Sequence, residues 1–505
     1  MHIKKRKMLT DVLMLEAVAE GKCIAKIDDK VLFVPFTAPE DIVDVEVGRQ
    51  KRNYMEGRVL RIKEPSKKRI EPRCKHFGVC GGCKWQHLKY DEQLKFKQKQ
   101  VRDQLERIGK VELPESENIL GSPEIFFFRN KLEYTFAPRK WFVNPLADGE
   151  EPAIEDVAAL GFHLPGRFDK ILDIEYCYLQ PELSNDIRLF VKQYALQNGY
   201  GFYDARRPNR QNGQDEPNIS VNTTTDGETS RDTPDRQSKD FSLRNMIIRN
   251  VGENFMVIIV VSKHDKEAIG NMLNAIAEKF PQVTSLYYIV NDKVNDSIGD
   301  LEAIHYSGEK CLTAEMPTFG DANQKLKFHI SPKSFYQTNS TQAYHLYSIA
   351  AEMASLKNDD VVYDLYTGTG TIALFVARSV KKVVGIEYVE EAIKDATVNA
   401  RDNSIDNVDF FYGDMAKVLT DEFVEKNGHP NVIITDPPRE GMHLSVVEML
   451  LRIAPERIVY ISCNAATQAR DLERLSEKYK VVRHRAVDMF PHTAHVESVC
   501  LLVRI

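Results

Sequence analysis

The sequence has no long hydrophobic run. Its longest unbroken apolar stretch covers residues 255–261, whereas a transmembrane helix needs about 20 such residues. Near the N-terminus, Asp11 and Glu16 interrupt anything that could serve as the core of a signal peptide, although basic residues precede them. We therefore expect no membrane span, no secretion and a cytoplasmic location.

Cysteine is also scarce, with 8 in 505 residues. So few cysteines exclude a disulfide scaffold, and clustered cysteines in a reduced setting favour metal or catalytic sites. The chain has no strong compositional bias either, since 43% hydrophobic and 28% charged residues exclude a collagen, a wholly disordered protein and a multispan membrane protein. Its length predicts about two to four domains.

The charge is distributed unevenly along the chain. Residues 1–110 hold 26 lysines and arginines against 16 acidic residues, a net charge of +10, which leaves −16 for the remainder of a chain whose total is −6. A basic segment suits a polyanion such as RNA, because lysine and arginine displace condensed counterions from phosphates. On charge alone, a solvated surface that happens to be basic is an equal alternative.

The sequence pattern predicts three domains. Short apolar stretches between turn residues predict a small β-barrel of about five strands over residues 1–66, an architecture that often binds nucleic acid. Residues 67–330 predict a central α/β domain with strands at 246–248 and 255–261. That domain also contains a predicted amphipathic helix with a basic face at residues 89–110 and a polar, disordered insertion at 208–239.

From residue 331 to residue 505, apolar strands alternate with helical segments. The predicted strands cover residues 361–365, 383–386, 409–412, 432–435 and 457–462. This alternation is the signature of a doubly wound, Rossmann-like parallel sheet.

The glycine-rich sequence D-L-Y-T-G-T-G-T at residues 364–371 follows one of these strands and opens a helix. Glycines there let the backbone turn tightly and approach a ligand, and Glu387, at the end of the next strand, can accept hydrogen bonds from both hydroxyls of a ribose. The alternative is that the glycines only allow close packing of the helix on the sheet.

Two further motifs end predicted strands. T-D-P-P-R places Asp436 at the ligand edge of the sheet, followed by two prolines that stiffen the loop. Enzymes that methylate exocyclic amines commonly carry an aromatic residue where Arg439 stands, which argues against that chemistry. I-S-C-N places Cys463 at the same edge, either as a thiolate nucleophile or as a small buried hydrophobe.

Near the C-terminus, M-F-P-H-T-A-H-V-E-S at residues 489–498 brings two histidines and Glu497 just before a last predicted strand at 499–503. Glu497 could take up a proton there, or it could be an ordinary charge at a strand edge.

A cysteine motif, C-x5-C-x2-C, lies between the barrel and the basic helix. It contains Cys74, Cys80 and Cys83. Three thiolates on a glycine-bearing loop favour an iron-sulfur cluster, with Cys177 as the best candidate for the fourth ligand. Zinc is the alternative, with His76 or His87 completing a tetrahedral site.

Taken in order, these motifs, together with F-Y-Q-T-N at residues 335–339, resemble those of the RNA uracil-5-methyltransferases, and the barrel resembles a TRAM domain. Within that family the chain is most similar to the iron-sulfur-containing 23S rRNA enzymes, because the tRNA branch generally lacks both the TRAM domain and the cysteine cluster. The sequence departs from the family pattern at Thr367, Ala465 and Cys23, where relatives commonly have cysteine, proline and a glycine-rich turn.

The resemblance implies a site for S-adenosylmethionine, a nucleophile, a base and a 4Fe-4S cluster. The expected cofactor contacts are Gln337, Tyr366, Thr371, Glu387 and Asp436. The expected nucleophile and base are Cys463 and Glu497, and the expected cluster ligands are Cys74, Cys80, Cys83 and Cys177.

The implied activity is formation of 5-methyluridine in 23S rRNA through a covalent bond between cysteine and carbon 6 of a flipped uracil. The alternatives are the same chemistry on the T-loop of tRNA and a non-catalytic iron-sulfur protein that binds RNA. We expect RNA as the partner, no obligate protein partner and a monomer.

Overall fold

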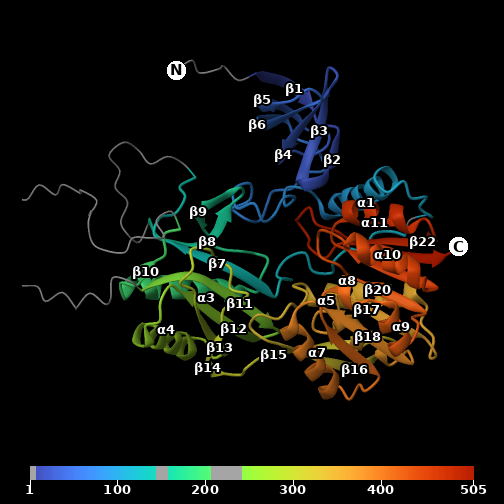
Figure 1. Ribbon diagram of the computed structural model, residues 1–505. Coiled ribbons are helices and arrows are strands. Elements are labelled where there is room, and N and C mark those ends of the chain that lie inside the picture. The colour runs from blue at the N-terminus through green and yellow to red at the C-terminus, as the bar shows by residue number, and fades with distance from the viewer. Residues whose placement is uncertain (1–6, 116, 144–156, 206–240) are drawn as a thin grey trace, which may run out of the picture. The chain divides into compact units, whose positions relative to one another are not determined.

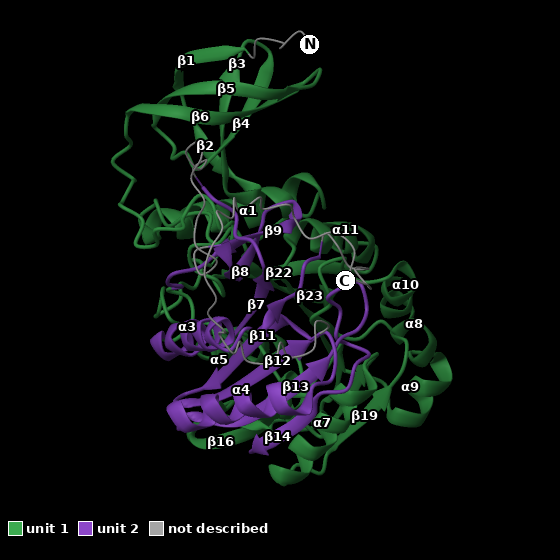
Figure 2. Ribbon diagram, turned by 90° about the vertical axis from the view of Figure 1, so that its left-hand side faces the viewer, with its two compact units in different colours: residues 1–130, 178–181, 311–505 green, residues 131–177, 182–310 purple. Residues whose placement is uncertain are grey.

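The computed structural model describes residues 7–115, 117–143, 157–205 and 241–505, so the predicted insertion at 208–239 lies outside the described residues. The chain divides into two compact units, which Figure 2 shows in different colours. Unit 1 comprises residues 1–130, 178–181 and 311–505, and unit 2 comprises residues 131–177 and 182–310. This division does not test the predicted domain boundaries at residues 66 and 330, which stay predictions.

Unit 1 begins with a small β-sheet in the order β1-β5-β6-β4-β3-β2 (Figure 1). Its strands are β1 (Met8–Leu13), β2 (Glu16–Val18), β3 (Lys22–Ile27), β4 (Lys30–Pro35), β5 (Ile42–Gln50) and β6 (Tyr54–Glu64), with the short helix η1 (Ala19–Gly21) between β2 and β3. Alternate residues of these strands, such as Leu32, Val34 and Val45, are fully buried in one core. The part of this region that the structure describes has six strands, one more than the sequence pattern suggested.

The cysteine segment is attached to this sheet. Trp85 is fully buried in the sheet's core, and the buried carboxylate of Asp41 accepts two short hydrogen bonds from the guanidinium of Arg69, at 2.8 and 2.7 Å. Gly21 has φ +74°, and a side chain there would lie 2.6 Å from Cβ of Lys84. Only glycine therefore allows this close approach.

Helix α1 (Tyr90–Arg107) confirms the predicted helix, but its cations are not free. Lys97 is fully buried and forms a 2.6 Å ion pair with Asp488, also fully buried. Further cations pair with acidic residues: Lys95, Lys99, Arg102 and Arg107. The expectation of a basic face is therefore corrected, because ion pairs neutralise most of its charge.

Unit 2 is built on a mixed sheet in the order β14-β13-β12-β11-β7-β8-β9, with β10 beside β11. Its strands are β7 (Lys131–Ala137), β8 (Ala159–Leu164), β9 (Arg167–Asp173), β10 (Gly201–Phe202), β11 (Ser242–Val251), β12 (Asn254–Val261), β13 (Val283–Val290) and β14 (Ile304–Gly308). Helices α3 (Glu182–Gln197) and α4 (Lys266–Lys279) share one hydrophobic core with the sheet (Figure 1). The predicted strands at 246–248 and 255–261 are confirmed as parts of β11 and β12.

The C-terminal sheet of unit 1 runs in the order β19-β18-β17-β20-β21-β23-β22, after a hairpin of β15 and β16. Its strands, with those of the hairpin, are β15 (Leu312–Thr318), β16 (Asp321–Ile330), β17 (Val361–Leu365), β18 (Lys382–Glu387), β19 (Val408–Tyr412), β20 (Val432–Thr435), β21 (Arg457–Ser462), β22 (Tyr479–Val487) and β23 (Glu497–Arg504). The helices are α5 (Ser340–Ala354), α6 (Thr371–Ala377), α7 (Glu390–Asp402), α8 (Met415–Val418), α9 (Asp421–Asn427), α10 (Leu444–Ile453) and α11 (Ala465–Leu475).

All five predicted strands of this sheet are confirmed, and they pair in parallel. The strand order reverses at β17, which has β18 on one side and β20 on the other. In open sheets of this kind, a ligand crevice lies outside the carboxyl ends of the strands at the reversal.

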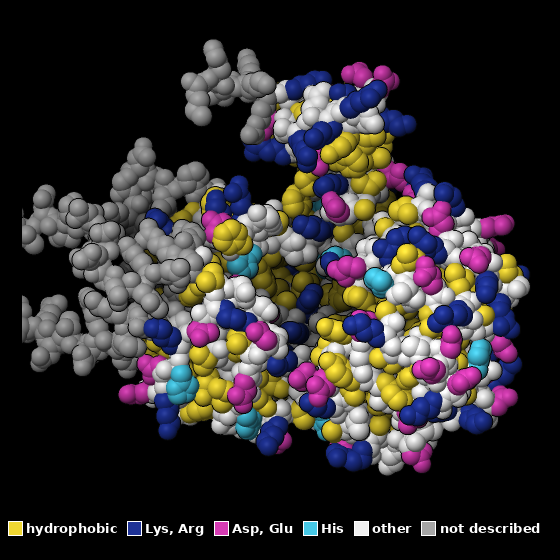
Figure 3. Space-filling view, viewed as in Figure 1, with side chains coloured by type: hydrophobic (Ala, Val, Ile, Leu, Met, Phe, Trp, Pro, Cys, Tyr) yellow, Lys and Arg dark blue, Asp and Glu magenta, His cyan; other side chains and the backbone are white. Residues whose placement is uncertain are grey.

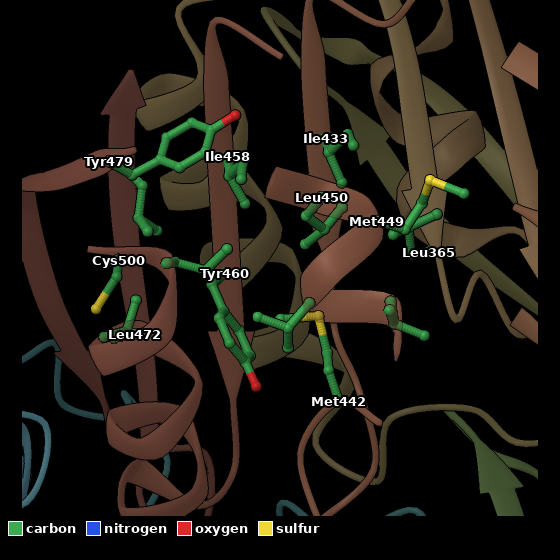
Figure 4. Close-up of a cluster of buried hydrophobic side chains, with 14 of the residues drawn as sticks. Leu365, Ile433, Met442, Met449, Leu450, Ile458, Tyr460, Leu472, Tyr479 and Cys500 are labelled. Atoms are coloured by element: carbon green, nitrogen blue, oxygen red, sulfur yellow. The ribbon is translucent and has the colours of Figure 1, made fainter. Parts of the chain in front are cut away.

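A hydrophobic core fixes these strand ends. Figure 4 shows Ile458 and Tyr460 of β21 facing Leu450 of α10 and Leu472 of α11, and all four side chains are at most 1% exposed. Close packing of this kind transmits little displacement, so the loops at the strand ends start from rigid positions. Among the described helices, none is long and apolar enough to cross a membrane.

Candidate active site

The glycine-rich loop turns sharply after β17. Tyr366, Gly368 and Gly370 all have positive φ, at 64°, 56° and 79°. A side chain on Gly370 would lie 2.8 Å from the ring of Phe410, so this glycine allows close packing, the alternative that the sequence left open. Gly368 differs, because a side chain there would meet no atom within 4 Å. The backbone at Gly368 therefore borders open space that a ligand can enter.

Glu387, the last residue of β18, closes the other side of this loop. Its Oε2 accepts a hydrogen bond from the Gly368 N–H at 3.0 Å, and its Oε1 accepts from the N–H groups of Tyr388 and Val389 at 2.9 Å. A carboxylate offers about four lone-pair sites, so Oε2 keeps one of them free. The carboxylate is thus fixed in place and can still accept a hydrogen bond from a ribose hydroxyl, which fits a nucleoside ligand.

Asp364 ties the loop to helix α6. Its Oδ2 accepts from the Thr367 hydroxyl at 2.6 Å and from the Ala373 N–H at 2.9 Å. Thr367 therefore has a clear role at the position where relatives commonly have cysteine. The other oxygen, Oδ1, is buried without a hydrogen-bond partner in the described structure, and burial raises the pKa of Asp364 to about 7.

The remaining expected cofactor residues lie on segments that meet this loop. Thr371 begins α6, and Asp436 follows β20, the strand beside β17. Gln337 precedes α5, and its carbonyl accepts a hydrogen bond from Asn130 at 2.9 Å. Two residues before it, the Phe335 carbonyl accepts from the hydroxyl of Thr369 in the glycine-rich loop.

Strand pairing places Cys463 next to Glu497. β21 pairs with β23 in antiparallel register, with Ser462 opposite Ser498. Cys463 directly follows Ser462, and Glu497 directly precedes Ser498, so the two residues adjoin the last pair of the ladder on the same side. Glu497 is the first residue of β23, rather than part of a preceding loop as expected from sequence.

Burial and neighbouring carboxylates set the pKa values of both side chains. Burial raises the pKa of the Cys463 thiol to about 11, and the Glu497 and Asp436 carboxylates contribute in the same direction. Burial, reinforced by Asp436, likewise raises the pKa of Glu497 well above its ordinary value. A glutamate with a raised pKa can exchange a proton near neutral pH.

Among the described residues that affect the pKa of Cys463, Arg439 is the one cation, and it opposes the rise in that pKa. Its positive charge lowers the pKa of Cys463, against the effect of burial. Its guanidinium lies 3.0 Å from Nδ1 of His495. From the sequence alone, Arg439 stands out only because an aromatic residue is missing at its position, since spacing along the chain cannot show that D-P-P-R and S-C-N meet.

Helix α11 holds the loop that carries Arg439. Asn464 caps this helix by accepting from the Ala466 N–H, and its amide donates to the Arg439 carbonyl at 3.0 Å. The Thr467 hydroxyl donates to the same carbonyl at 3.1 Å. These bonds hold the loop behind Cys463 although Ala465 stands where relatives commonly have proline.

The cysteine loop has the donor chemistry expected for a thiolate-bound cluster. The buried Gln86 side chain accepts from the Cys74 N–H at 3.1 Å and donates to Sγ of Cys83 at 3.2 Å, the type of N–H···S contact that surrounds metal-bound thiolates. Cys80 and Cys74 are close enough to interact electrostatically. Within the described ranges, however, no three Cys, His, Asp or Glu side chains take the arrangement of metal ligands.

Neither Cys177 nor His87 belongs to a group of metal ligands among the described residues. Cys177 belongs to unit 2, where its backbone N–H donates to Asn185 at 2.8 Å. His87 is buried in the barrel region, with Nε2 3.1 Å from the Thr37 carbonyl. Burial lowers the pKa of His87 to about 4, so that its ring is neutral.

Comparison with protein families assigns two parts of the chain. The family model "tRNA (Uracil-5-)-methyltransferase" matches residues 316–505, and the model "TRAM domain" matches residues 10–60. A protein of Bacteroides thetaiotaomicron named "Uncharacterized RNA methyltransferase" is 48% identical over 96% of this chain and 99% of its own length. A protein of the same name from Porphyromonas gingivalis is 48% identical over 97% of this chain and 98% of its own length.

Among solved structures, the tRNA (uracil-54, C5)-methyltransferase of Pyrococcus abyssi, in complex with S-adenosyl-L-homocysteine, is similar over 98% of this chain and 100% of its own. The TM-score is 0.68 and the sequence identity is 26%.

Proposed function

Since this chain belongs to the RNA uracil-5-methyltransferase family and uses S-adenosylmethionine as methyl donor, we propose that its product is 5-methyluridine in 23S rRNA. The resemblance drawn from the sequence motifs is confirmed at the level of the family and of the TRAM domain. The observation that carries the proposal is the pairing of β21 with β23, which brings Cys463 and Glu497 together.

In this proposal Cys463 is the nucleophile. Carbon 5 of uracil is too weak a nucleophile to take a methyl group directly from a sulfonium. Addition of the Cys463 thiolate to carbon 6 forms a C–S bond and moves an electron pair to carbon 5, which then attacks the methyl group. Arg439 favours the thiolate, because its positive charge opposes the rise in the pKa of Cys463 that burial causes.

Glu497 is the proposed base. After methyl transfer, carbon 5 bears both a methyl group and a proton. A carboxylate removes this proton, the C–S bond breaks, and the Cys463 thiolate and 5-methyluracil are released. General bases typically contribute roughly 100- to 10,000-fold in rate. The 5% exposure of Glu497 excludes bulk water from this step.

S-adenosylmethionine, when bound, supplies an electrophilic methyl group on a sulfonium. In our proposal Glu387 holds its ribose, the open backbone at Gly368 lets it approach, and Tyr366, Thr371, Asp436 and Gln337 complete the contacts. The fixed carboxylate of Glu387 and the open space at Gly368 support this assignment.

The RNA class is the finer part of the proposal. Resemblance to the iron-sulfur branch of the family favours 23S rRNA. A tRNA substrate is the second candidate, because the P. abyssi enzyme, whose name gives tRNA uracil-54 as its target, matches nearly the whole chain. That match includes the barrel region, so the barrel does not separate the two substrates.

We also propose that Cys74, Cys80, Cys83 and Cys177 hold a 4Fe-4S cluster with a structural role. The bridge that Gln86 forms between Cys83 and Cys74 supports the assignment of these cysteines as cluster ligands. Arg73 precedes Cys74, and Tyr178 follows Cys177. The guanidinium of Arg73 lies 4.5 Å from the centre of the Tyr178 ring. Methyl transfer needs no electron, so the cluster would shape the fold.

The decisive experiment maps 5-methyluridine in rRNA and tRNA from cells that lack the gene and carry wild type, Cys463→Ala or Cys311→Ala. Cys311 is a partly buried thiol beside His329, and its removal is the matched control. We expect cells without the gene to lack one 5-methyluridine in 23S rRNA. Wild type and Cys311→Ala should restore it, whereas Cys463→Ala should not. A mark missing from tRNA instead would keep the mechanism and overturn the rRNA assignment, and no change in either RNA would overturn both.

The cluster proposal is tested on Cys80→Ser against Cys311→Ser, both purified without oxygen. We expect Cys80→Ser to lose bound iron and sulfide and to unfold at a lower temperature or bind RNA more weakly. Full stability and normal RNA binding without the cluster, with turnover abolished, would contradict a structural role.

A further inference from the structure

Unit 2 carries a group of cations that have no acidic partner among the described residues. They are Arg139, Lys140, Arg167 and Lys170. None of them forms an ion pair within the described chain, whereas Lys192 of the same unit binds Asp173 at 2.7 Å. The four cations come from two adjoining segments, residues 139–143 and 167–170, because the Trp141 N–H donates to the Ile171 carbonyl at 2.7 Å.

Large hydrophobic side chains stand among these cations. Phe168 is 74% exposed, Val143 is 59% exposed and Trp141 is 39% exposed. The ammonium of Lys170 lies 3.9 Å from the centre of the Trp141 ring, and that of Lys140 lies 5.2 Å from the Phe142 ring. Figure 3 shows blue and yellow side chains together over the β8–β9 hairpin. Exposed aromatic residues that cluster in this way mark interaction surfaces.

A hollow adjoins the surface formed by residues 139–143 and 167–170. Arg139, His163, Phe168 and Tyr203 help to line it, together with three acids, Asp169, Asp204 and Asp296. The Tyr203 ring is held in place by Arg244, whose guanidinium lies 3.9 Å from the ring centre and also pairs with Asp296 at 2.9 Å. The hollow thus offers ring faces at a fixed position but has acids in its lining, so the charge that would attract phosphates lies on the two neighbouring segments.

We propose that residues 139–143 and 167–170, with the hollow beside them, form a second RNA-binding surface that holds an unpaired stretch of the substrate. Aromatic faces stack on nucleobases of any sequence, and lysine and arginine beside them contact the phosphates. Asp169 is the one acid in the two segments against four cations, which suits a polyanion. The inference rests on RNA as the substrate, but unit 2 contains neither Cys463 nor Glu497, so this surface holds the RNA and does not react with it.

The tryptophan content of the chain allows a direct test. The chain has two tryptophans, and Trp85 is fully buried. Iodide therefore quenches only Trp141 in the wild-type protein. A single-stranded oligouridine should quench Trp141 emission by stacking and should protect the residue from iodide, with the same midpoint as the anisotropy of the same RNA carrying a fluorescent label.

Variants test the two components separately by anisotropy with the labelled RNA. Trp141→Ala with Phe168→Ala should weaken binding roughly tenfold or more. Arg139→Gln with Arg167→Gln should lower the slope of log affinity against log salt by about 0.7 for each phosphate that the variant no longer neutralises. The matched controls are Leu189→Ala in α3 and Lys266→Ala in α4, away from the proposed surface. They remove an exposed apolar side chain and a cation without an ion pair in the described structure. Both should bind RNA as wild type does.

An unchanged Trp141 emission at saturating RNA would overturn the proposal, even if methylation proceeds normally. A change in Trp141 emission with protein concentration alone, without RNA, would also overturn it, by identifying the surface as a contact between proteins. Quenching by RNA in a protein that methylates neither rRNA nor tRNA would support the surface and contradict the proposed function.

Discussion

Burial controls the protonation of the acidic residues at the site. Asp364, Asp436 and Glu497 converge on the carboxyl ends of β17 and β20 and the start of β23, and burial raises the pKa of each. Arg439 is the nearby charge that works in the opposite direction at Glu497 and Cys463. Protonation of single residues at this site is therefore set by desolvation first and by one arginine second.

Replacing Arg439 should make the Cys463 thiol less reactive. In Arg439→Gln the pKa of Cys463, already about 11, should rise further. Alkylation of Cys463 by iodoacetamide at pH 8, followed by mass spectrometry, should slow by roughly tenfold per unit of pKa, and Arg439→Lys should recover part of the rate. Arg474→Gln, at an exposed position of α11, is the control. An unchanged alkylation rate in Arg439→Gln would contradict the electrostatic role.

Asp364 should make the protein less stable as the pH rises. Its pKa is about 7 when folded and 3.8 ordinarily, so the folded state holds the proton more tightly. Between about pH 4 and pH 7 its contribution to stability should fall by up to about 1.4 kcal/mol per pH unit.

Thermal unfolding at pH 5 and pH 7.5 measures this effect. The drop in stability between the two should be smaller in Asp364→Asn than in wild type, whereas Asp359→Asn, at an exposed neighbouring position, should match wild type. An equal drop in Asp364→Asn and wild type would show that this carboxyl group does not titrate in that range.

At the scale of elements, the site depends on how helices hold the loops at the strand ends. α11 fixes the loop of Arg439 through Asn464 and Thr467. α1 fixes the segment before β23, since Lys97 pairs with Asp488 and the Gln93 side chain accepts from the His492 N–H at 3.0 Å. The start of β23, with Glu497, thus follows a segment that is held by a helix almost 400 residues earlier in the chain.

Breaking the buried pair of α1 should strongly destabilise the protein. Lys97→Met leaves the Asp488 carboxylate buried without its cation, which typically costs about 3–5 kcal/mol. Lys97→Met with Asp488→Leu should recover much of the free energy of unfolding, because no unpaired charge remains. Urea unfolding measures both. Arg102→Met, which removes an exposed pair with Glu106, should cost less than about 1 kcal/mol, and a similar cost for Lys97→Met would refute the argument.

At the scale of the whole molecule, the cations that are free to meet RNA differ from those expected. The cations of α1 are largely paired, whereas Arg49, Lys51 and Arg52, in and beside the turn between β5 and β6, are exposed and have no ion pair in the described structure. This turn belongs to the region that matches the TRAM domain model. The net charge of a segment is thus a poor guide to its RNA-binding surface, because ion pairs remove part of it.

Neutralising this turn should weaken RNA binding. Changing Arg49, Lys51 and Arg52 to Gln should lower affinity and reduce the salt slope by about 0.7–0.9 for each phosphate left without its cation, as measured by anisotropy at several salt concentrations. Changing Arg102, Arg107 and Lys110 to Gln is the matched control, because these cations are already paired. An equal decrease in affinity in both triple variants would mean that total charge, and not free charge, governs binding.

The sequence by itself determined six of the seven strands of the C-terminal sheet, all but β22, together with the helix at residues 90–107 and the family. Periodicity and motif spacing can be recognised from neighbouring residues alone. Only the tertiary structure decided that Glu497 stands beside Cys463, that the charge of Arg439 acts on the thiol, and that the lysines of α1 form ion pairs. These three facts depend on which strands pair and which charges meet across long stretches of chain. The cysteine ligand set stays a prediction, since no group of metal ligands forms among the described residues. Local patterns fix secondary structure, whereas the register of β21 against β23 and the packing of α1 are set by burial over the whole fold.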